Sequence, residues 1–509
     1  MNPLALVALP AHAVLARFAA QTLTPSDYLA ACLEHITLFN PKVNALTALD
    51  AERAVAQASQ ATQRWKAGTP IGPLDGLPIG VKDLQDTKGL LTTHGSKRGR
   101  ANVPTQDLPM VARLRAAGAI ILAKTNVPEL GAGGNSRNPV WGATGNPFNP
   151  DLIAGGSSGG SAAALAADLL PLCTGSDTGG SLRLPASLCG IVGYRPSVDV
   201  VAHPTRPLGW SGISVLGPMA RTMDDLLLML NVIQGHDRDD PLSSPAAPDR
   251  FATLPQVDLK TLRVGYSEDF GGAPVDPAIR KTFRARIDAL RPHVMDCRPA
   301  SLDLGQMDRV FDILRAESFV AGFAEALKTA PGDFGDHIAQ NVAMGQAMTL
   351  ADRSWAHAEQ TRILRNFNKV MDAFDIILLP TAPVSPFPWQ QSHPTEIDGQ
   401  VMDVYYRWLA LMYRGSLTGG PALTLPCGRD PHGMPFGLQM LGPLRGDERL
   451  LATAKALETL FDRDADTARP RPDMAALAAS NVDLRAIVTH PPVLTSAVPS
   501  STPNIRTAV

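Results

Sequence analysis

Short apolar runs alternate with amphipathic helical patterns along this chain, and this alternation limits the folds that it can adopt. Four runs have the length and composition of buried strands, namely 77–83 (LPIGVKD), 119–125 (AIILAKT), 262–267 (LRVGYS) and 375–381 (DIILLPT). Helical spacing marks residues 24–39, which open with the capping signal Thr24-Pro25, and residues 276–293. Strands that alternate with helices predict a layered α/β fold.

The charge balance argues against nucleic acid as a partner. Lys and Arg number 46 and Asp and Glu 48, which gives a formal net charge of −2. No apolar run approaches the roughly 18 residues of a membrane span. The apolar opening lacks a basic segment and is interrupted by Pro10 and His12, so we expect a mature helical start and no signal peptide.

The five cysteines are odd in number and form no C-x-x-C pair, which favours neither a disulfide framework nor a zinc site. We therefore expect a cytoplasmic protein that binds no membrane and no metal. Residues 235–256 are charged, proline-rich and aperiodic, so a loop or linker is expected there, which could separate two lobes. The last dozen residues have the composition of a frayed tail.

The most informative passage, residues 153–186, is rich in glycine and serine. Its first part, Gly155 to Gly159, matches the G-x-S-x-G pattern of a nucleophile elbow, but no strand pattern precedes it and no triad partners stand out among the 11 histidines. No G-K-[ST] follows, which disfavours a phosphate loop. In SDTGGSLRLP (176–185) the amides before Ser181 can converge to hold an oxyanion, and the alternative is a tight turn ending in a serine.

Taken together, these motifs resemble the amidase signature family of serine hydrolases. GGSSGGS is followed by SDTGGSLRLP with Ser157 and Ser181 24 residues apart, and GLPIGVKD places Lys82 75 residues before Ser157. The resemblance covers roughly residues 20–465 and includes AIILAKTNVPEL, GATGNPFNP, DIILLPTAP and PALTLPCGRDPHGMPFGLQMLGP. It implies an amidase-signature α/β fold, in which helices cover both faces of a mixed central β-sheet.

This resemblance also implies the domain organisation. We expect one large amidase signature domain over residues 1–465, with a helical N-terminal part over 1–70. A partly irregular C-terminal extension is expected over 466–509.

The family's Ser-cisSer-Lys triad carries over to Ser181 as nucleophile, Ser157 as the relay after a cis peptide bond, and Lys82 as the base. Lysine is a base only when neutral, and burial on an interior strand lowers its pKa from about 10.4. The alternative is a solvated lysine paired with Asp83. Lys124 has the same local appearance, so only the family spacing selects Lys82, and Lys124 is expected to be structural.

Other loop residues have supporting roles by the same resemblance. Asp177 is expected to accept backbone hydrogen bonds, Arg183 to brace the loop, and Ser158 to allow close packing. The oxyanion would be held by the backbone N–H groups of Thr178, Gly179, Gly180 and Ser181.

The implied activity is hydrolysis of the C–N bond of a small-molecule amide, through an acyl-enzyme on Ser181, to a carboxylic acid plus ammonia or amine. No cofactor is implied, and the protein is expected to be a monomer or homodimer. The alternatives are the glutaminase-type component of a tRNA-dependent amidotransferase, a carbamate or ester hydrolase of the same family, and a non-enzymatic scaffold. Leu184 argues against the amidotransferase glutaminase, which usually has Gln at that position.

The acyl pocket is expected to come from the region between about 300 and 420. Its aromatic and methionine side chains either line this pocket or pack in the core: Trp389, Tyr405, Tyr406, Trp408, Met412 and Tyr413.

Overall fold

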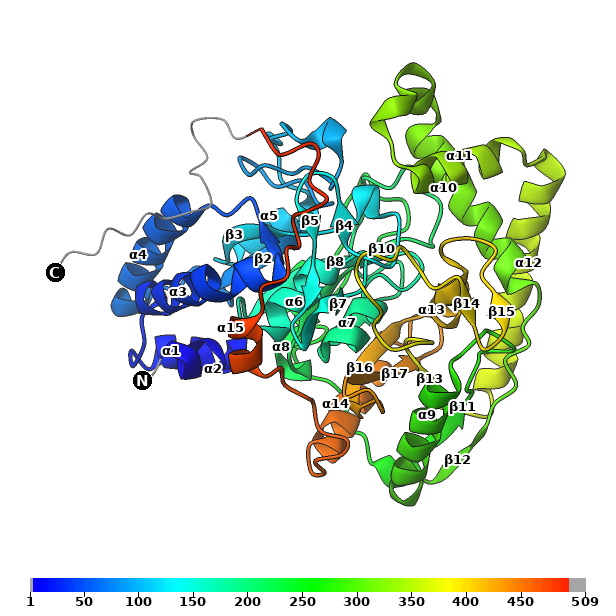
Figure 1. Ribbon diagram of the computed structural model, residues 1–509. Helices are drawn as coiled ribbons and strands as arrows, with labels where there is room; N and C mark the ends of the chain where they lie inside the picture. The colour runs from blue at the N-terminus through cyan, green and yellow to red at the C-terminus, as the bar shows by residue number, and fades with distance from the viewer. Residues whose placement is uncertain (1–2, 494–509) are drawn as a thin grey trace.

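A mixed β-sheet of eleven strands forms the centre of the protein, as the computed structural model of residues 3–493 shows (Figure 1). The strands are, in spatial order, β1 (Leu46–Thr47), β3 (Ile120–Thr125), β2 (Pro78–Lys82), β8 (Leu172–Asp177), β10 (Val215–Ala220), β9 (Val192–Arg195), β16 (Ala422–Arg429), β17 (Pro435–Leu441), β13 (Ile376–Pro380), β11 (Arg263–Tyr266) and β12 (Asp296–Pro299). Strand β2 is parallel to β3 and β8, and β11 to β12 and β13, whereas the other neighbours are antiparallel. This sheet confirms the α/β fold class.

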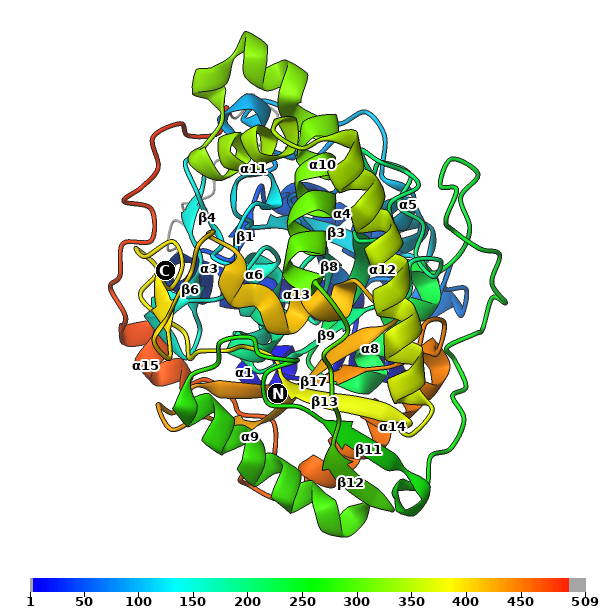
Figure 2. The same cartoon turned by 90° about the vertical axis from the view of Figure 1, so that its right-hand side faces the viewer.

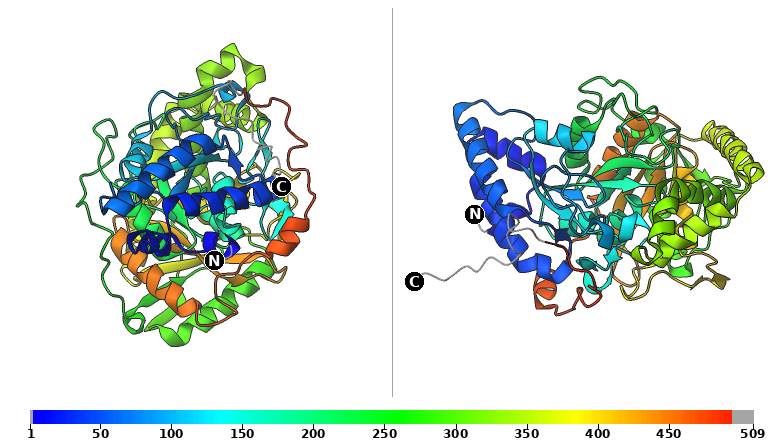
Figure 3. Two further views of the ribbon diagram at one scale, coloured as in Figure 1. Left: turned by 90° about the vertical axis from the view of Figure 1, so that its left-hand side faces the viewer. Right: turned by 90° about the horizontal axis from the view of Figure 1, so that it is seen from above.

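Helices lie on both sides of the sheet. Their bounds are α1 (Pro3–Val7), α2 (Ala11–Ala19), α3 (Pro25–Val43), α4 (Ala51–Ala67), α5 (Pro109–Ala116), α6 (Gly159–Ala166), α7 (Arg183–Cys189), α8 (Met223–Ile233), α9 (Pro277–Leu290), α10 (Met307–Thr329), α11 (Asp336–Gln346), α12 (Leu350–Met371), α13 (Ala410–Ser416), α14 (Asp447–Phe461) and α15 (Met474–Ala479). Helices α10 and α12 face the viewer in Figure 2, and the blue N-terminal helices face the viewer on the left of Figure 3. The N-terminal helices and the α10–α12 group therefore lie on opposite sides of the molecule.

Three small antiparallel ladders complete the regular structure. They pair β4 (Arg137–Asn138) with β5 (Gly142–Ala143), β6 (Gly145–Asn146) with β7 (Asn149–Ile153), and β14 (Glu396–Ile397) with β15 (Gln400–Val401). Among residues 3–493, no helix has the length and apolar character needed to cross a membrane.

The sequence signals place these elements for local reasons. Strands β2, β3, β11 and β13 each fall inside the ranges predicted from the apolar runs. Helix α3 begins where the capping signal predicts, because the Thr24 side chain accepts a hydrogen bond from the Asp27 N–H and Pro25 occupies the first turn. It continues to Val43 and ends at Asn44, whose φ of 47° leaves the helical region.

The predicted loop at 235–256 contains no helix or strand, and the structure describes this segment throughout. Strand β10 precedes it and β11 follows it, and both belong to the same sheet. The loop therefore connects two parts of one sheet.

The C-terminal segment folds back along the N-terminal half of the chain, as the red trace shows (Figure 1). After α15, the backbone donates from Thr489 to the Pro139 carbonyl at 3.0 Å and from Val493 to the Arg100 carbonyl at 2.8 Å. The frayed tail predicted for the last dozen residues lies outside the described part of the chain.

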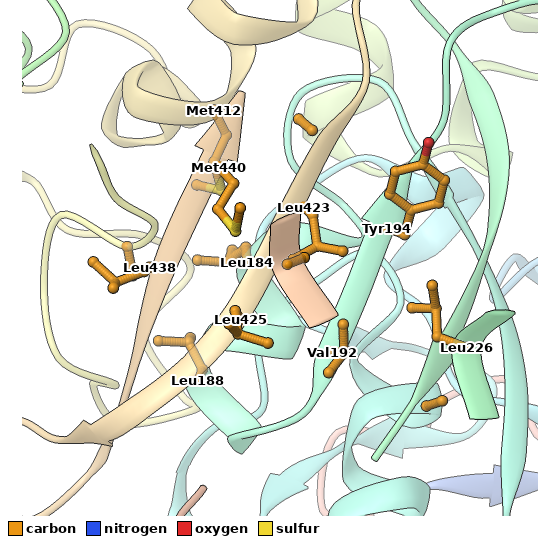
Figure 4. Packing of buried hydrophobic residues seen from close by; sticks show 14 of the residues in the cluster. Leu184, Leu188, Val192, Tyr194, Leu226, Met412, Leu423, Leu425, Leu438 and Met440 are labelled. Carbon is orange, nitrogen blue, oxygen red and sulfur yellow. The ribbon is translucent and has the colours of Figure 1, made fainter. Parts of the chain in front are cut away.

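An apolar core fixes α7 against the sheet. Leu184 and Leu188 of α7 lie beside Leu425 of β16 and Leu438 and Met440 of β17 (Figure 4). All five are nearly or completely buried. Because α7 begins two residues after Ser181, this packing holds the serine loop in place.

Candidate active site

Lys82 ends strand β2, and its side chain is completely buried. Its Nζ lies 2.7 Å from both Ser157 Oγ and Ser158 Oγ, and 2.9 Å from Ser176 Oγ on the adjacent strand β8. Burial lowers the pKa of Lys82 from its usual value to about 7, although the charge of Asp177 opposes the shift. A substantial fraction of this amine is therefore neutral near pH 7.

Ser157 and Ser158 lie immediately before helix α6. The peptide bond between Gly156 and Ser157 is cis, as the resemblance implies. A Cβ atom on Gly156 would lie 2.9 Å from the Gly133 carbonyl oxygen, so the backbone passes too closely for a side chain. Both serines are buried, which keeps the lysine–serine contacts away from bulk water.

Ser181 lies in the turn between β8 and α7 and is half-buried. Its carbonyl accepts a hydrogen bond from the Ser158 N–H at 3.2 Å, which joins the two glycine–serine motifs. Within residues 3–493 the Ser181 hydroxyl has no hydrogen-bond partner, and the residue lines a cavity. The hydroxyl is thus available to a ligand.

Asp177 organises the serine loop from inside the protein. Its carboxylate accepts hydrogen bonds from the N–H groups of Gly180 at 3.0 Å and Leu182 at 3.1 Å. It also accepts from Arg183 Nε at 3.0 Å and Nη2 at 2.8 Å, and it pairs with Arg195 at 3.3 Å. Burial opposes its ionisation, but Arg183 and Arg195 hold the pKa of Asp177 well below its usual value.

Arg183 connects this loop to more distant elements. Its Nη1 donates to the Met412 carbonyl in α13 at 2.9 Å and to Gln439 Oε1 in β17 at 2.6 Å. Because Arg183 is completely buried, the loop, the helix and the strand form one rigid unit.

The four backbone donors expected from the sequence divide into two groups. The Gly180 N–H donates to Asp177 Oδ1, so the carboxylate that shapes the loop already uses this hydrogen. The N–H groups of Thr178, Gly179 and Ser181 have no acceptor in the part of the chain that the structure describes. These three remain available for an oxyanion.

A cavity of about 320 Å³ lies against these residues. Ser157, Ser176, Thr178 and Ser181 line it on one side. Its other walls come from the loop between β9 and β10 and from helix α10, including His203, Arg206, Leu208, Ile213, Leu216, Arg315, Phe319 and Phe323.

Several site residues are not singled out by the sequence. Ser176 begins the motif at 176–185, yet only the pairing of β8 with β2 brings its hydroxyl to Lys82. Arg315 had a readable signal, because it follows Phe311 and precedes Phe319 by four residues and so interrupts the apolar face of a helix. The loop at 203–216 carries no comparable signal.

The side chains considered for the acyl pocket pack in the core instead. All six are buried, and none of them lines the cavity of about 320 Å³. Tyr413 stacks on Phe311 with ring centroids 4.3 Å apart, and Tyr405 stacks on His337 at 3.7 Å. The core alternative therefore holds for these residues.

Comparison with known proteins gives consistent similarities. The model of the family described as Amidase matches residues 27–451. The acylamidase of Rhodococcus erythropolis is 32% identical over 461 residues, which cover 89% of this chain and 95% of that protein. The glutaminase-type component of the glutamyl-tRNA(Gln) amidotransferase of Chloroflexus aurantiacus is 33% identical over 484 residues, covering 90% and 97%.

A solved structure agrees with these sequence similarities. The crystal structure of a bacterial aryl acylamidase of the amidase signature family superposes with a TM-score of 0.83 at 25% identity. The superposition covers 93% of this chain and 99% of that chain.

Proposed function

Because this chain belongs to the amidase family, we propose that it hydrolyses a small-molecule amide through an acyl-enzyme on Ser181, with Ser157 and Lys82 as the proton relay. One observation carries this proposal. The amine of Lys82, with a pKa of about 7, contacts Ser157 in a buried position beside a cavity that Ser181 lines. A neutral amine has two N–H bonds and a lone pair, so one neighbouring hydroxyl can donate to Nζ.

In the acylation step, Ser181 Oγ attacks the amide carbonyl. Ser157 takes the Ser181 proton and passes its own proton to Lys82. The new C–O bond forms as the carbonyl oxygen gains negative charge, which the N–H groups of Thr178, Gly179 and Ser181 stabilise. The Gly180 N–H contributes through the loop, because it is shared with Asp177.

Collapse of the tetrahedral intermediate breaks the C–N bond. The Lys82 ammonium returns its proton through Ser157 to the leaving nitrogen, which would otherwise depart as a poor amide anion. Water then attacks the acyl-enzyme by the same relay and releases the carboxylic acid. We further propose a cytoplasmic monomer or homodimer with one amidase domain over residues 1–465.

Similarity to a component of a glutamyl-tRNA(Gln) amidotransferase supports a second candidate function, the release of ammonia from glutamine for partner proteins. Leu184 disfavours it, because this position usually holds Gln in the amidotransferase glutaminases. The Leu184 side chain is completely buried in the apolar core beside α7. Glutaminase activity that appears only when partner proteins are added would favour this candidate.

Labelling with a fluorophosphonate tests the identity of the nucleophile. We expect one adduct on Ser181, located by peptide mass mapping, and no labelling of Ser181→Ala. An adduct on Ser157 or Ser158 alone would contradict the proposal. A panel of primary amides, anilides, carbamates and esters, scored for amine or ammonia release, then defines the accepted leaving group.

A further inference from the structure

Arg315 is a buried cation with no counterion at the wall of the active-site cavity. Its side chain lies in α10, is 8% exposed and lines the cavity. Its Nη2 donates to the Tyr405 hydroxyl at 2.6 Å, whereas its buried Nε has no acceptor. Among residues 3–493, no carboxylate forms an ion pair with it, and Nη1 makes no hydrogen bond.

The other charged groups near the cavity are compensated. Arg206, the second arginine in the wall, pairs with buried Asp240 through contacts of 2.8 and 3.1 Å. His94 contacts Asp86 at 3.2 Å. Of the described residues that line the cavity, none is an aspartate or a glutamate. The net charge of the wall is therefore positive, and Arg315 carries it.

Aromatic rings hold the guanidinium in place without neutralising it. Its Cζ lies 4.7 Å from the ring centroid of Phe319, 5.0 Å from Tyr406 and 5.6 Å from Tyr405. Asn341 also donates to the Tyr405 hydroxyl at 2.8 Å, which fixes the ring that Arg315 contacts. Such stacking favours a cation and orients it, but leaves its unpaired N–H groups to another partner.

An unpaired charge removed from water is costly, and a carboxylate in the same cavity would offset that cost through a charge-assisted hydrogen bond. We propose that Arg315 binds a carboxylate of the substrate, so that the preferred substrates are amides with a second, free carboxylate, such as monoamides of dicarboxylic acids. This inference rests on the proposed function, since it names the substrate class of the same site.

Paired substrates test the inference on the unmodified enzyme. Each pair has the leaving amine that the panel above defines and the same chain length, but ends in a carboxylate in one member and a methyl group in the other. At a favoured chain length we expect kcat/KM to be about 10- to 100-fold higher for the carboxylate member, as for one hydrogen bond to a charged group. Equal values across the whole series would overturn the inference.

Two variants on the same helix locate the preference. Arg315→Gln is expected to remove the advantage of the carboxylate member and to keep turnover of the methyl member. Arg309→Gln is the matched control, because Arg309 also stacks on a ring, that of Trp355, but is exposed and paired with Asp352. A preference that persists in folded Arg315→Gln would overturn the assignment.

If Arg315→Gln does not fold, inhibition of the unmodified enzyme decides. Dicarboxylates are expected to compete about 10-fold better than monocarboxylates of the same length, and equal inhibition would overturn the inference. The methyl series separates this result from the proposed function. If the unmodified enzyme cleaves no amide of either series, the proposed function itself fails.

Discussion

Lys82 and Lys124 lie on neighbouring parallel strands with their side chains on opposite faces of the sheet. In the β2–β3 register Lys82 pairs with Thr125, and Lys124 pairs with Val81. Both lysines are completely buried. The amine of Lys124 contacts the Gln85 carbonyl and, at 2.8 Å, Thr87 Oγ1, whereas that of Lys82 contacts serines.

This arrangement predicts that the two lysines differ in their effect on catalysis. Replacing Lys82 with Met removes the proposed base, so kcat for amide hydrolysis should fall by about 100- to 10,000-fold. Lys124→Met leaves the serine contacts in place, so it should keep most of kcat even where stability falls. Steady-state rates, with circular dichroism as a check of folding, measure both. Near-normal turnover in Lys82→Met would exclude the relay.

The lowered pKa of Lys82 predicts the pH dependence of the reaction. Its amine is protonated below a pH of about 7 and neutral above it, and only the neutral form accepts a proton. We therefore expect kcat/KM for a neutral amide to rise about tenfold per pH unit at lower pH and to level off above about pH 7. A pH–rate profile measures this. A flat profile down to about pH 5 would be inconsistent with Lys82 as the base.

Asp177 predicts a large loss of stability when its charge is removed. Asp177→Asn leaves Arg183 and Arg195 buried without their counterion, so the free energy of unfolding should fall by about 3–5 kcal/mol. Urea denaturation measures the change. The matched control is Asp288→Asn at an exposed ion pair, where a change within about 0.5 kcal/mol is expected. Similar losses in the two variants would argue against the buried charge cluster.

Local signals were sufficient for part of the fold and of the site. The strands around Lys82 and Lys124 follow from apolar runs, and the start of α3 follows from Thr24 and Pro25. Ser157 and Ser181 stand in glycine-rich motifs whose sequence spacing is readable directly. Packing and capping act over a few residues, so the sequence determined these features by itself.

The cavity wall depends on contacts that are distant in sequence. Arg315 reaches the cavity from α10, and Tyr405 and Asn341 hold it from other segments. Tyr413 fills the core because α13 packs against α10, although its sequence spacing suits a pocket wall equally well. Side-chain periodicity defines a face but not the element that covers it.

The residue types, the strand ends and the serine spacing were therefore determined by the sequence alone. Tertiary structure decided which lysine meets the serines, since a one-residue offset along a strand turns a side chain to the other face of the sheet. It also left Arg315 without a counterion, because the carboxylates near the cavity are already paired with other cations. Such pairings arise only when the distant elements pack together.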